Sequence, residues 1–115
     1  MKQKEIYQLI VTISGRPASV GYRQLTRAVA LVVQRKEFPV RCLTSELYPE
    51  IARDTHSSPQ NVARNIARAV EDCWEHGNRK ELERIAGRRL TEKPSPGEMI
   101  LYLFNYCIAK EEQKD

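Results

Sequence analysis

The chain lacks any hydrophobic run long enough to cross a membrane. A transmembrane helix needs about 20 consecutive apolar residues. The apolar stretch at residues 6–13 is short and is interrupted by Gln8 and Thr12. It also lacks the small-residue cleavage site of a signal peptide. These absences predict a protein that stays in the cytoplasm and does not bind a membrane.

Cysteine and histidine are scarce, which argues against a disulfide framework and against a zinc site. The three cysteines, Cys42, Cys73 and Cys107, are widely spaced and form no Cys-x-x-Cys pair. Cys73 and Cys107 lie among apolar neighbours, which predicts free buried thiols. His56 and His76 fall in a turn and at a helix end, and neither has a second ligand at a zinc-site spacing. Both histidines are predicted to be solvent-exposed.

Motifs of catalysis are missing as well. The sequence contains no Gly-x-Ser-x-Gly and no glycine-rich phosphate loop. A small helical enzyme would need a pocket with converging polar groups, and no group of residues in the sequence indicates one. We therefore expect neither enzymatic activity nor a cofactor.

Composition and charge are those of one globular domain with a basic N-terminal third. The chain has 115 residues, of which 41% are hydrophobic and 30% charged, enough for one core but not two. The net charge of +4 is unevenly distributed: residues 1–41 carry +6, residues 42–69 are neutral and residues 70–115 carry −2. A basic third fits contact with a polyanion such as the DNA backbone. A merely solvated surface would explain this charge equally well.

Every long segment has helical periodicity, and no segment alternates convincingly as a strand would. The six predicted helices span residues 4–14, 21–36, 44–54, 59–76, 80–85 and 96–110. Residues 37–43 are predicted to be a connector. Pro49 near the start of the third helix predicts an irregular first turn, and Ser95 with Glu98 forms a capping box for the last helix. The sequence thus predicts an all-α fold, a compact six-helix domain over residues 1–115.

The predicted fourth helix has two unlike faces. Ser58 can cap it, Pro59 suits its first position, and Gly77 is predicted to end it in a left-handed conformation. The apolar face consists of Val62, Ile66, Ala69, Val70, Cys73 and Trp74. The opposite face consists of Gln60, Asn61, Arg64, Asn65 and Arg68, followed by Glu71, Asp72 and Glu75. The exposed face is therefore predicted to be basic and amide-rich near its N-terminus and acidic near its C-terminus. Trp74 is expected to anchor the core rather than to stack on a base.

The third and fourth helices have the spacing of a helix-turn-helix over residues 44–77. Helix pairs that do not bind DNA, the plain αα-corners, share this spacing. The helix-turn-helix prediction therefore depends on the side chains of the exposed face of the fourth helix. Arg64 and Arg68 can reach guanine or phosphate, and Asn61 and Asn65 can pair with adenine or contact the backbone. The predicted DNA-binding residues are Ser58, Gln60, Asn61, Arg64, Asn65 and Arg68. We expect the fourth helix to enter the major groove of double-stranded DNA.

These same residues carry a family resemblance over residues 5–109. The matching positions are Gly21-Tyr22, the run 47–52, Val62, Arg64, Ile66, Ala69, Glu71, Trp74, Gly77-Asn78 and Gly87. In them the chain resembles the C-terminal DNA-binding domain of the sporulation-initiating response regulator of endospore-forming bacteria. The resemblance implies six helices, with the fourth as recognition helix. It also implies binding to short DNA boxes, often as tandem dimers, to activate or repress transcription.

The resemblance further implies a protein partner. The region after the recognition helix, about residues 74–85 here, contacts a sigma subunit of RNA polymerase in the family, which points to Glu75, Arg79 and Lys80. The chain also departs from the family, because Asn61, Ala63 and Ala67 stand where charged residues are usual. That departure implies a different or weaker DNA code. The alternative function is a helical interaction module that modulates the sigma subunit or a full-length regulator without strong DNA readout.

The family's receiver domain, with its phospho-accepting aspartate, has no counterpart in these 115 residues. Two explanations stay open. The sequence is either a fragment that starts at an added Met1 or a stand-alone protein that phosphorylation does not switch in the family's manner.

Overall fold

The computed structural model describes residues 1–38 and 43–113, and it confirms the all-α fold. The helices are α1 (Gln3–Val11), α2 (Val20–Arg35), α3 (Tyr48–Asp54), α4 (Pro59–His76), α5 (Arg79–Ala86) and α6 (Pro96–Gln113), with a π-helical turn η1 (Leu43–Leu47) before α3. Most of the predicted connector, together with Cys42, lies outside the described residues. Within the described ranges there is no strand, and no helix is long and apolar enough to span a membrane.

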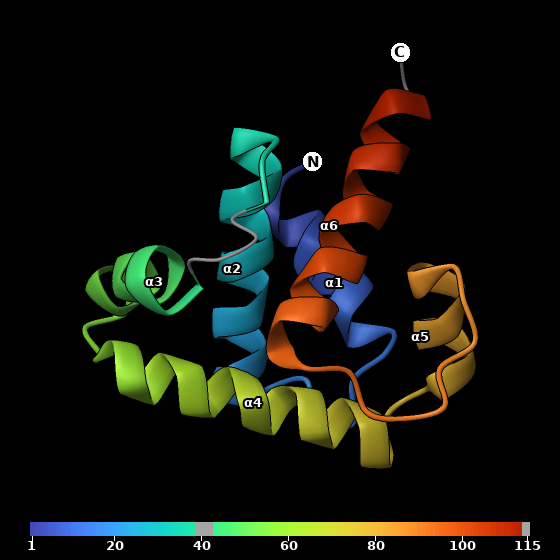
Figure 1. Cartoon of the computed structure of the whole chain (residues 1–115), viewed down its shortest axis with the longest axis horizontal. Helices are drawn as coiled ribbons and strands as arrows, with labels where there is room; N and C mark the ends of the chain where they lie inside the picture. Colours follow the sequence, from blue (N-terminus) through green and yellow to red (C-terminus); the bar gives the residue numbers. More distant parts are fainter. Residues whose placement is uncertain (39–42, 114–115) are drawn as a thin grey trace.

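Helix α4 crosses the ends of the other long helices. Figure 1 shows α1, α2 and α6 standing side by side, with α4 lying across their lower ends, α3 near one end of it and α5 near the other. Helix α2 is central, because it packs against α1, α3, α4 and α6. The largest fully buried side chains come from η1 and from every α-helix: Ile6, Ile10, Tyr22, Leu25, Leu47, Ile51, Ile66, Leu82, Met99, Ile100 and Leu103, together with Ile13 after α1.

The crossing of α2 over α4 depends on a glycine. A Cβ atom added to Gly21 would lie 2.2 Å from the backbone oxygen of Asn65 and 3.0 Å from the Cβ of Ala69. Only glycine lets the two backbones approach this closely. The first turn of α2 is therefore fixed against the middle of α4.

The end of α4 differs from the prediction. Gly77 is extended, with φ −91° and ψ −168°, so the expected left-handed ending is wrong. A Cβ on Gly77 would lie 2.0 Å from the backbone oxygen of Ile13, which accepts hydrogen bonds from the Asn78 N–H (3.3 Å) and the Cys73 thiol (3.2 Å). Glycine is needed here for a close approach to the segment after α1, a long-range contact that local sequence signals do not reveal.

Other helix boundaries shift by a few residues. Helix α1 ends at Val11, three residues before the predicted end, and α6 continues to Gln113. Lys36, predicted as helical, ends α2 in the left-handed region at φ 55°. The predicted third helix is divided into η1 and α3, which confirms the irregular start expected from Pro49.

Two local predictions hold in detail. The capping box of α6 is formed, with the Glu98 carboxylate accepting from the Ser95 N–H at 2.9 Å and the Ser95 hydroxyl accepting from the Glu98 N–H at 3.1 Å. Cys73 and Cys107 are buried free thiols. Burial raises the pKa of Cys73 to about 12 and that of Cys107 to about 11, so both thiols are protonated and unreactive at neutral pH.

We expect Gly21→Ala to lower the free energy of unfolding by about 1–3 kcal/mol, because the added methyl group forces α2 away from the α4 backbone. Urea denaturation followed by circular dichroism measures this loss. Gly97→Ala is the matched control, since its nearest neighbour is the flexible end of the Leu43 side chain at 3.1 Å. Equal stability of the two variants would contradict a backbone constraint at the crossing.

Candidate nucleic-acid interface

Helices α3 and α4 are joined by a four-residue turn, residues 55–58, and pack against each other. The Ser57 N–H donates to the Ala52 backbone oxygen at 2.9 Å, which closes the turn on the end of α3. His56 occupies the left-handed region at φ 53°, where glycine is more usual. Sequence reasoning missed this conformation, since histidine gives no strong signal for it.

The start of α4 is capped as predicted. The Ser58 hydroxyl accepts a hydrogen bond from the Asn61 N–H at 3.1 Å, and Pro59 occupies the first turn. Ser58 is therefore a structural residue of the helix as well as a predicted DNA-binding residue. The predicted apolar face is confirmed, because Val62, Ile66, Ala69, Val70 and Cys73 are all buried.

The outer face of α4 presents the predicted binding side chains together. Gln60, Asn61, Arg64 and Arg68 are exposed, and Asn65 is half-buried. The Arg64 guanidinium donates to the Asn61 side-chain oxygen at 2.7 Å. This bond orients Arg64 and leaves the Asn61 amide group free to donate outward. These residues lie along the N-terminal half of the helix, on its outer side.

The sequence predicted that Asp72 lies with Glu71 and Glu75 on an exposed acidic face, and the structure differs. Asp72 is half-buried, and its Oδ2 atom accepts hydrogen bonds from the Tyr22 hydroxyl at 2.6 Å and the Arg16 N–H at 2.8 Å. The Tyr22 hydroxyl in turn accepts from the Gly15 N–H at 3.3 Å. Asp72 thus ties the loop between α1 and α2 to α4, whereas Glu71 and Glu75 remain exposed as predicted.

These bonds shift two pKa values in opposite directions. Partial burial works to raise the pKa of Asp72, but the hydrogen bonds from the Tyr22 hydroxyl and the Arg16 N–H act against it, and that pKa lies below its usual value. Burial, reinforced by the hydrogen bond to Asp72, raises the pKa of Tyr22 well above the usual value. At neutral pH the pair is an ionised carboxylate and a neutral phenol.

At the C-terminal end of α4, Trp74 is stacked against Arg79, the first residue of α5. The guanidinium carbon of Arg79 lies 3.7 Å from the centroid of the Trp74 ring, and its Nε donates to the Trp74 backbone oxygen at 3.1 Å. Trp74 is partly buried and packs against the core, as expected. Glu75, Arg79 and Lys80, the predicted sigma-contacting residues, are all exposed at this junction of α4 and α5.

One feature near the interface was missed by sequence reasoning. A shallow hollow between α4 and the first turn of α2 is lined by Arg16, Ser19, Val20, Gly21, Asn65, Arg68, Ala69 and Asp72. It brings together residues about 50 positions apart, so no local pattern could reveal it. His56 and His76 are solvent-exposed as predicted. Across the described ranges, no three His, Cys, Asp or Glu side chains gather as a metal site would require.

The carboxylate of Asp72 should make the stability of the fold depend on acid. Because its pKa is depressed in the folded chain, its contribution is complete above the unfolded value of about 3.9 and is lost as the pH falls through the folded pKa. We expect the free energy of unfolding to fall more steeply between about pH 5 and pH 2 for the unchanged chain than for Asp72→Asn. Urea titrations at several pH values measure both slopes, and parallel curves would contradict the assignment.

Comparison with known families agrees with this architecture. Residues 6–107 match the family described as Sporulation initiation factor Spo0A C terminal. The match covers all of α2 to α5 and two thirds of each of α1 and α6. It therefore includes both the α3–turn–α4 unit and the α4–α5 junction. The chain belongs to this family of regulatory DNA-binding domains of sporulation initiation.

Proposed function

We propose that the domain binds double-stranded DNA in a sequence-specific manner, with the N-terminal half of α4 in the major groove. One observation carries this proposal. The inner face of α4 is used completely by the core, while its outer face presents exposed arginine and amide side chains in its first three turns. Asn61 and Arg64 bond to each other, and the side chains of Gln60 and Arg68 are exposed. These groups match the hydrogen-bonding edges of bases and phosphates.

The dimensions of α4 suit the groove. Its 18 residues give a length of about 27 Å, and the major groove is about 12 Å wide. Arg64 and Arg68 are one turn apart on the same face, so their guanidinium groups can address neighbouring positions of one duplex. Arginine binds the O6 and N7 atoms of guanine in a bidentate manner.

The acidic C-terminal end of α4 limits how the helix can enter the major groove. Glu71 and Glu75 are exposed in the C-terminal half, and phosphate groups repel carboxylates. The N-terminal end of the helix carries a partial positive charge and favours phosphate. The proposed binding mode therefore places the first turns of α4 deepest and keeps the last turns outside the groove, as recognition helices do.

Binding should weaken steeply with salt, because phosphate contacts release counterions. We expect Arg64→Ala and Arg68→Ala each to weaken binding to a DNA site selected from a random pool by about 10- to 100-fold, the equivalent of about 1–3 kcal/mol. Fluorescence anisotropy with a labelled duplex at two salt concentrations measures both effects.

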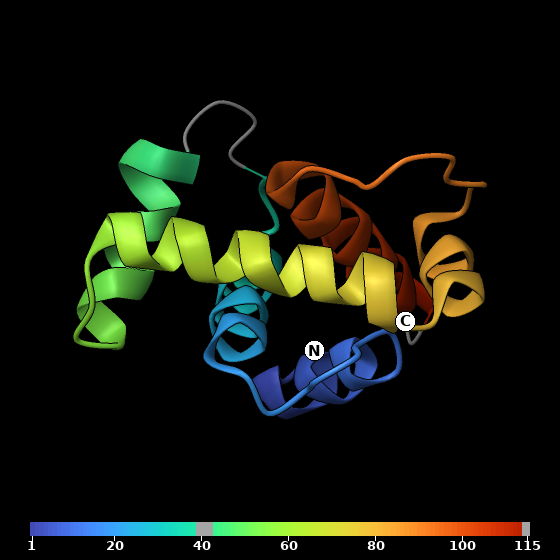
Figure 2. The same ribbon diagram turned by 90° about the horizontal axis from the view of Figure 1, so that it is seen from below.

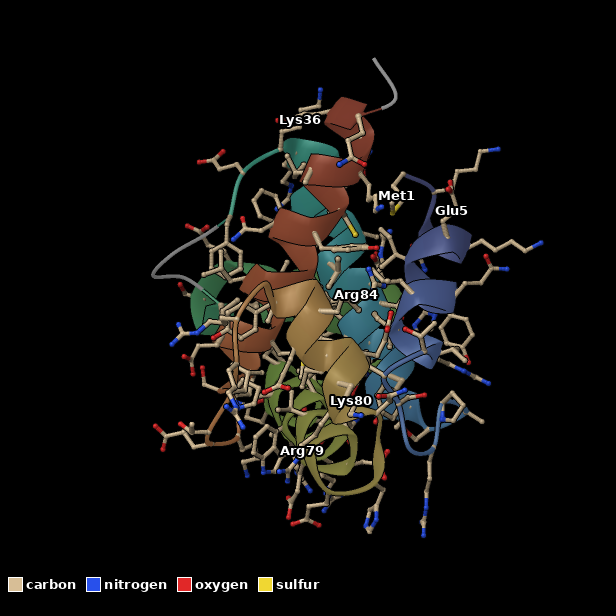
Figure 3. All side chains as sticks on the ribbon, turned by 90° about the vertical axis from the view of Figure 1, so that its right-hand side faces the viewer. Met1, Glu5, Lys36, Arg79, Lys80 and Arg84 are labelled. Atoms are coloured by element: carbon tan, nitrogen blue, oxygen red, sulfur yellow. The ribbon has the colours of Figure 1, made fainter. Side chains whose placement is uncertain are left out.

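Lys36→Gln serves as the control for charge, since Lys36 lies at the end of the molecule remote from Arg79 and the α4–α5 junction (Figure 3). It should change affinity much less than either arginine substitution. If Arg64→Ala and Arg68→Ala leave affinity unchanged, α4 is not the recognition helix.

We propose a second surface at the α4–α5 junction, for the sigma subunit of RNA polymerase. The Arg79–Trp74 stack is an ordered contact, and it holds the start of α5 against the end of α4. Figure 3 shows Arg79 and Lys80 together at the end of α5 nearest to α4. Because this junction follows the half of α4 that stays outside the groove, it remains free for a protein partner on DNA.

Charge reversal separates this surface from DNA binding. We expect Lys80→Glu to change transcription from a responsive promoter at least several-fold while DNA affinity changes little. Transcription in vitro with purified polymerase, beside anisotropy on the same promoter, measures the two properties. Loss of transcription only in proportion to DNA affinity would contradict a separate partner surface. In that case the junction would be a structural connection between helices.

A further inference from the structure

The loop between α1 and α2, residues 12–19, lies beside the outer face of α4. Figure 2 looks onto this face and shows α4 crossing it, with the loop and the start of α2 on one side and α3 at one end. Arg16 of the loop and Arg68 of α4 line the same hollow, and both side chains are exposed. A molecule that contacts the outer face of α4 at Arg68 therefore meets the loop as well.

The loop is held by α4 itself. Asp72 accepts the Arg16 N–H at 2.8 Å and the Tyr22 hydroxyl at 2.6 Å with the same oxygen atom. Gly15 fits beside it without room for a side chain, since a Cβ there would lie 2.8 Å from that oxygen. These contacts anchor both the loop and the start of α2 to one carboxylate of the recognition helix.

The charges of this region favour an anion. An exposed aspartate on a DNA-facing helix would repel phosphate, but the charge of Asp72 is directed toward two hydrogen-bond donors. The two charged side chains that stay exposed around the hollow are Arg16 and Arg68. The hollow is also continuous with the surface proposed to enter the major groove, since Asn65 and Arg68 belong to both. The backbone of the same duplex is the anion that this geometry brings nearest.

We propose that the α1–α2 loop is a second DNA-binding segment, in which Arg16 contacts a backbone phosphate beside the groove that α4 reads. Asp72 is a positioning residue: it fixes the loop in register with α4 and does not itself touch DNA. This inference rests on the proposed DNA-binding function and adds a contact that the helix-turn-helix does not include. Phosphate contacts of this kind fix orientation on the duplex and carry no sequence information.

Two substitutions of Asp72 separate its role in positioning the loop from the effect of its charge. Asp72→Asn keeps an oxygen that can accept both hydrogen bonds, whereas Asp72→Ala removes the acceptor, and the two variants have equal net charge. We expect Asp72→Ala to bind DNA about 3- to 10-fold more weakly than Asp72→Asn, with the loss equal on the selected site and on random duplex. Anisotropy titrations over a range of salt concentrations measure this difference.

Arg16→Gln directly tests the proposed contact between Arg16 and a backbone phosphate. It should weaken binding to both duplexes by a similar factor and reduce the slope of log affinity against log salt by about 0.9, the value for one phosphate contact. In the double variant Asp72→Ala with Arg16→Gln, we expect no further loss beyond the larger single effect, because Asp72 acts through the loop. Additive losses would overturn the positioning role.

Tyr22→Phe provides an independent variant that leaves the charge unchanged. It removes one of the two donors to Asp72 and should weaken DNA binding in the same direction as Asp72→Ala. Thermal melts followed by circular dichroism establish that each variant is folded at the titration temperature. If Asp72→Ala does not fold, the comparison of Tyr22→Phe and Arg16→Gln with the unchanged chain decides the question.

The outcomes distinguish this inference from the proposed function. If Arg64→Ala weakens binding and Arg16→Gln does not, α4 reads DNA and the loop is not a contact, which overturns the inference alone. If neither substitution has an effect, the proposed DNA interface itself is wrong. Equal affinities of Asp72→Asn and Asp72→Ala would also overturn the positioning role.

Discussion

The close crossing of α2 and α4 is the constraint on which the rest of the structure depends. Gly21 brings the α2 backbone against Asn65 and Ala69 in the middle of α4, where no side chain would fit. This contact fixes the angle at which α4 lies across α1, α2 and α6 (Figure 1). Once one face of α4 is committed to these helices, its opposite face is necessarily presented to solvent. The orientation of the candidate interface is therefore set by core packing and not by the interface residues.

Charged residues are segregated along α4, and the different parts of the helix make different contacts. Near the N-terminus the outer face carries arginine and amide groups, which have no role in the core. Further along, the carboxylate of Asp72 is used inside the domain, because it satisfies the Arg16 N–H and the Tyr22 hydroxyl. At the end of the helix, Trp74 and Arg79 form the contact with α5. One 18-residue helix thus connects the core, the α1–α2 loop and α5, and its polar residues are placed by these contacts.

Local signals in the sequence were sufficient to predict the helices but insufficient to predict the contacts between them. Helical periodicity and the caps at Ser58 and Ser95 located α4 and α6 to within a few residues, since both signals act within one or two turns. The conformation of Gly77 and the role of Asp72 depend on partners at least 50 residues away, Ile13 and Tyr22. Periodicity could place Asp72 only on the polar face. Most of the candidate interface was predicted for the same reason: exposure of one face follows from burial of the other.

The departures from the family that the sequence predicts at Asn61, Ala63 and Ala67 bear on how the proposed binding mode would discriminate between DNA sequences. In the proposed binding mode Ala67, which is exposed on the outer side of α4, offers only a methyl group, which can contact a thymine methyl but cannot hydrogen-bond. Asn61 uses its oxygen to orient Arg64, so these two residues address the duplex as one unit. Readout of bases then rests on few side chains, and phosphate contacts supply a larger share of the affinity. In this binding mode the register of the domain on the duplex has to be held firmly, and the α1–α2 loop, which Asp72 ties to α4, would hold it.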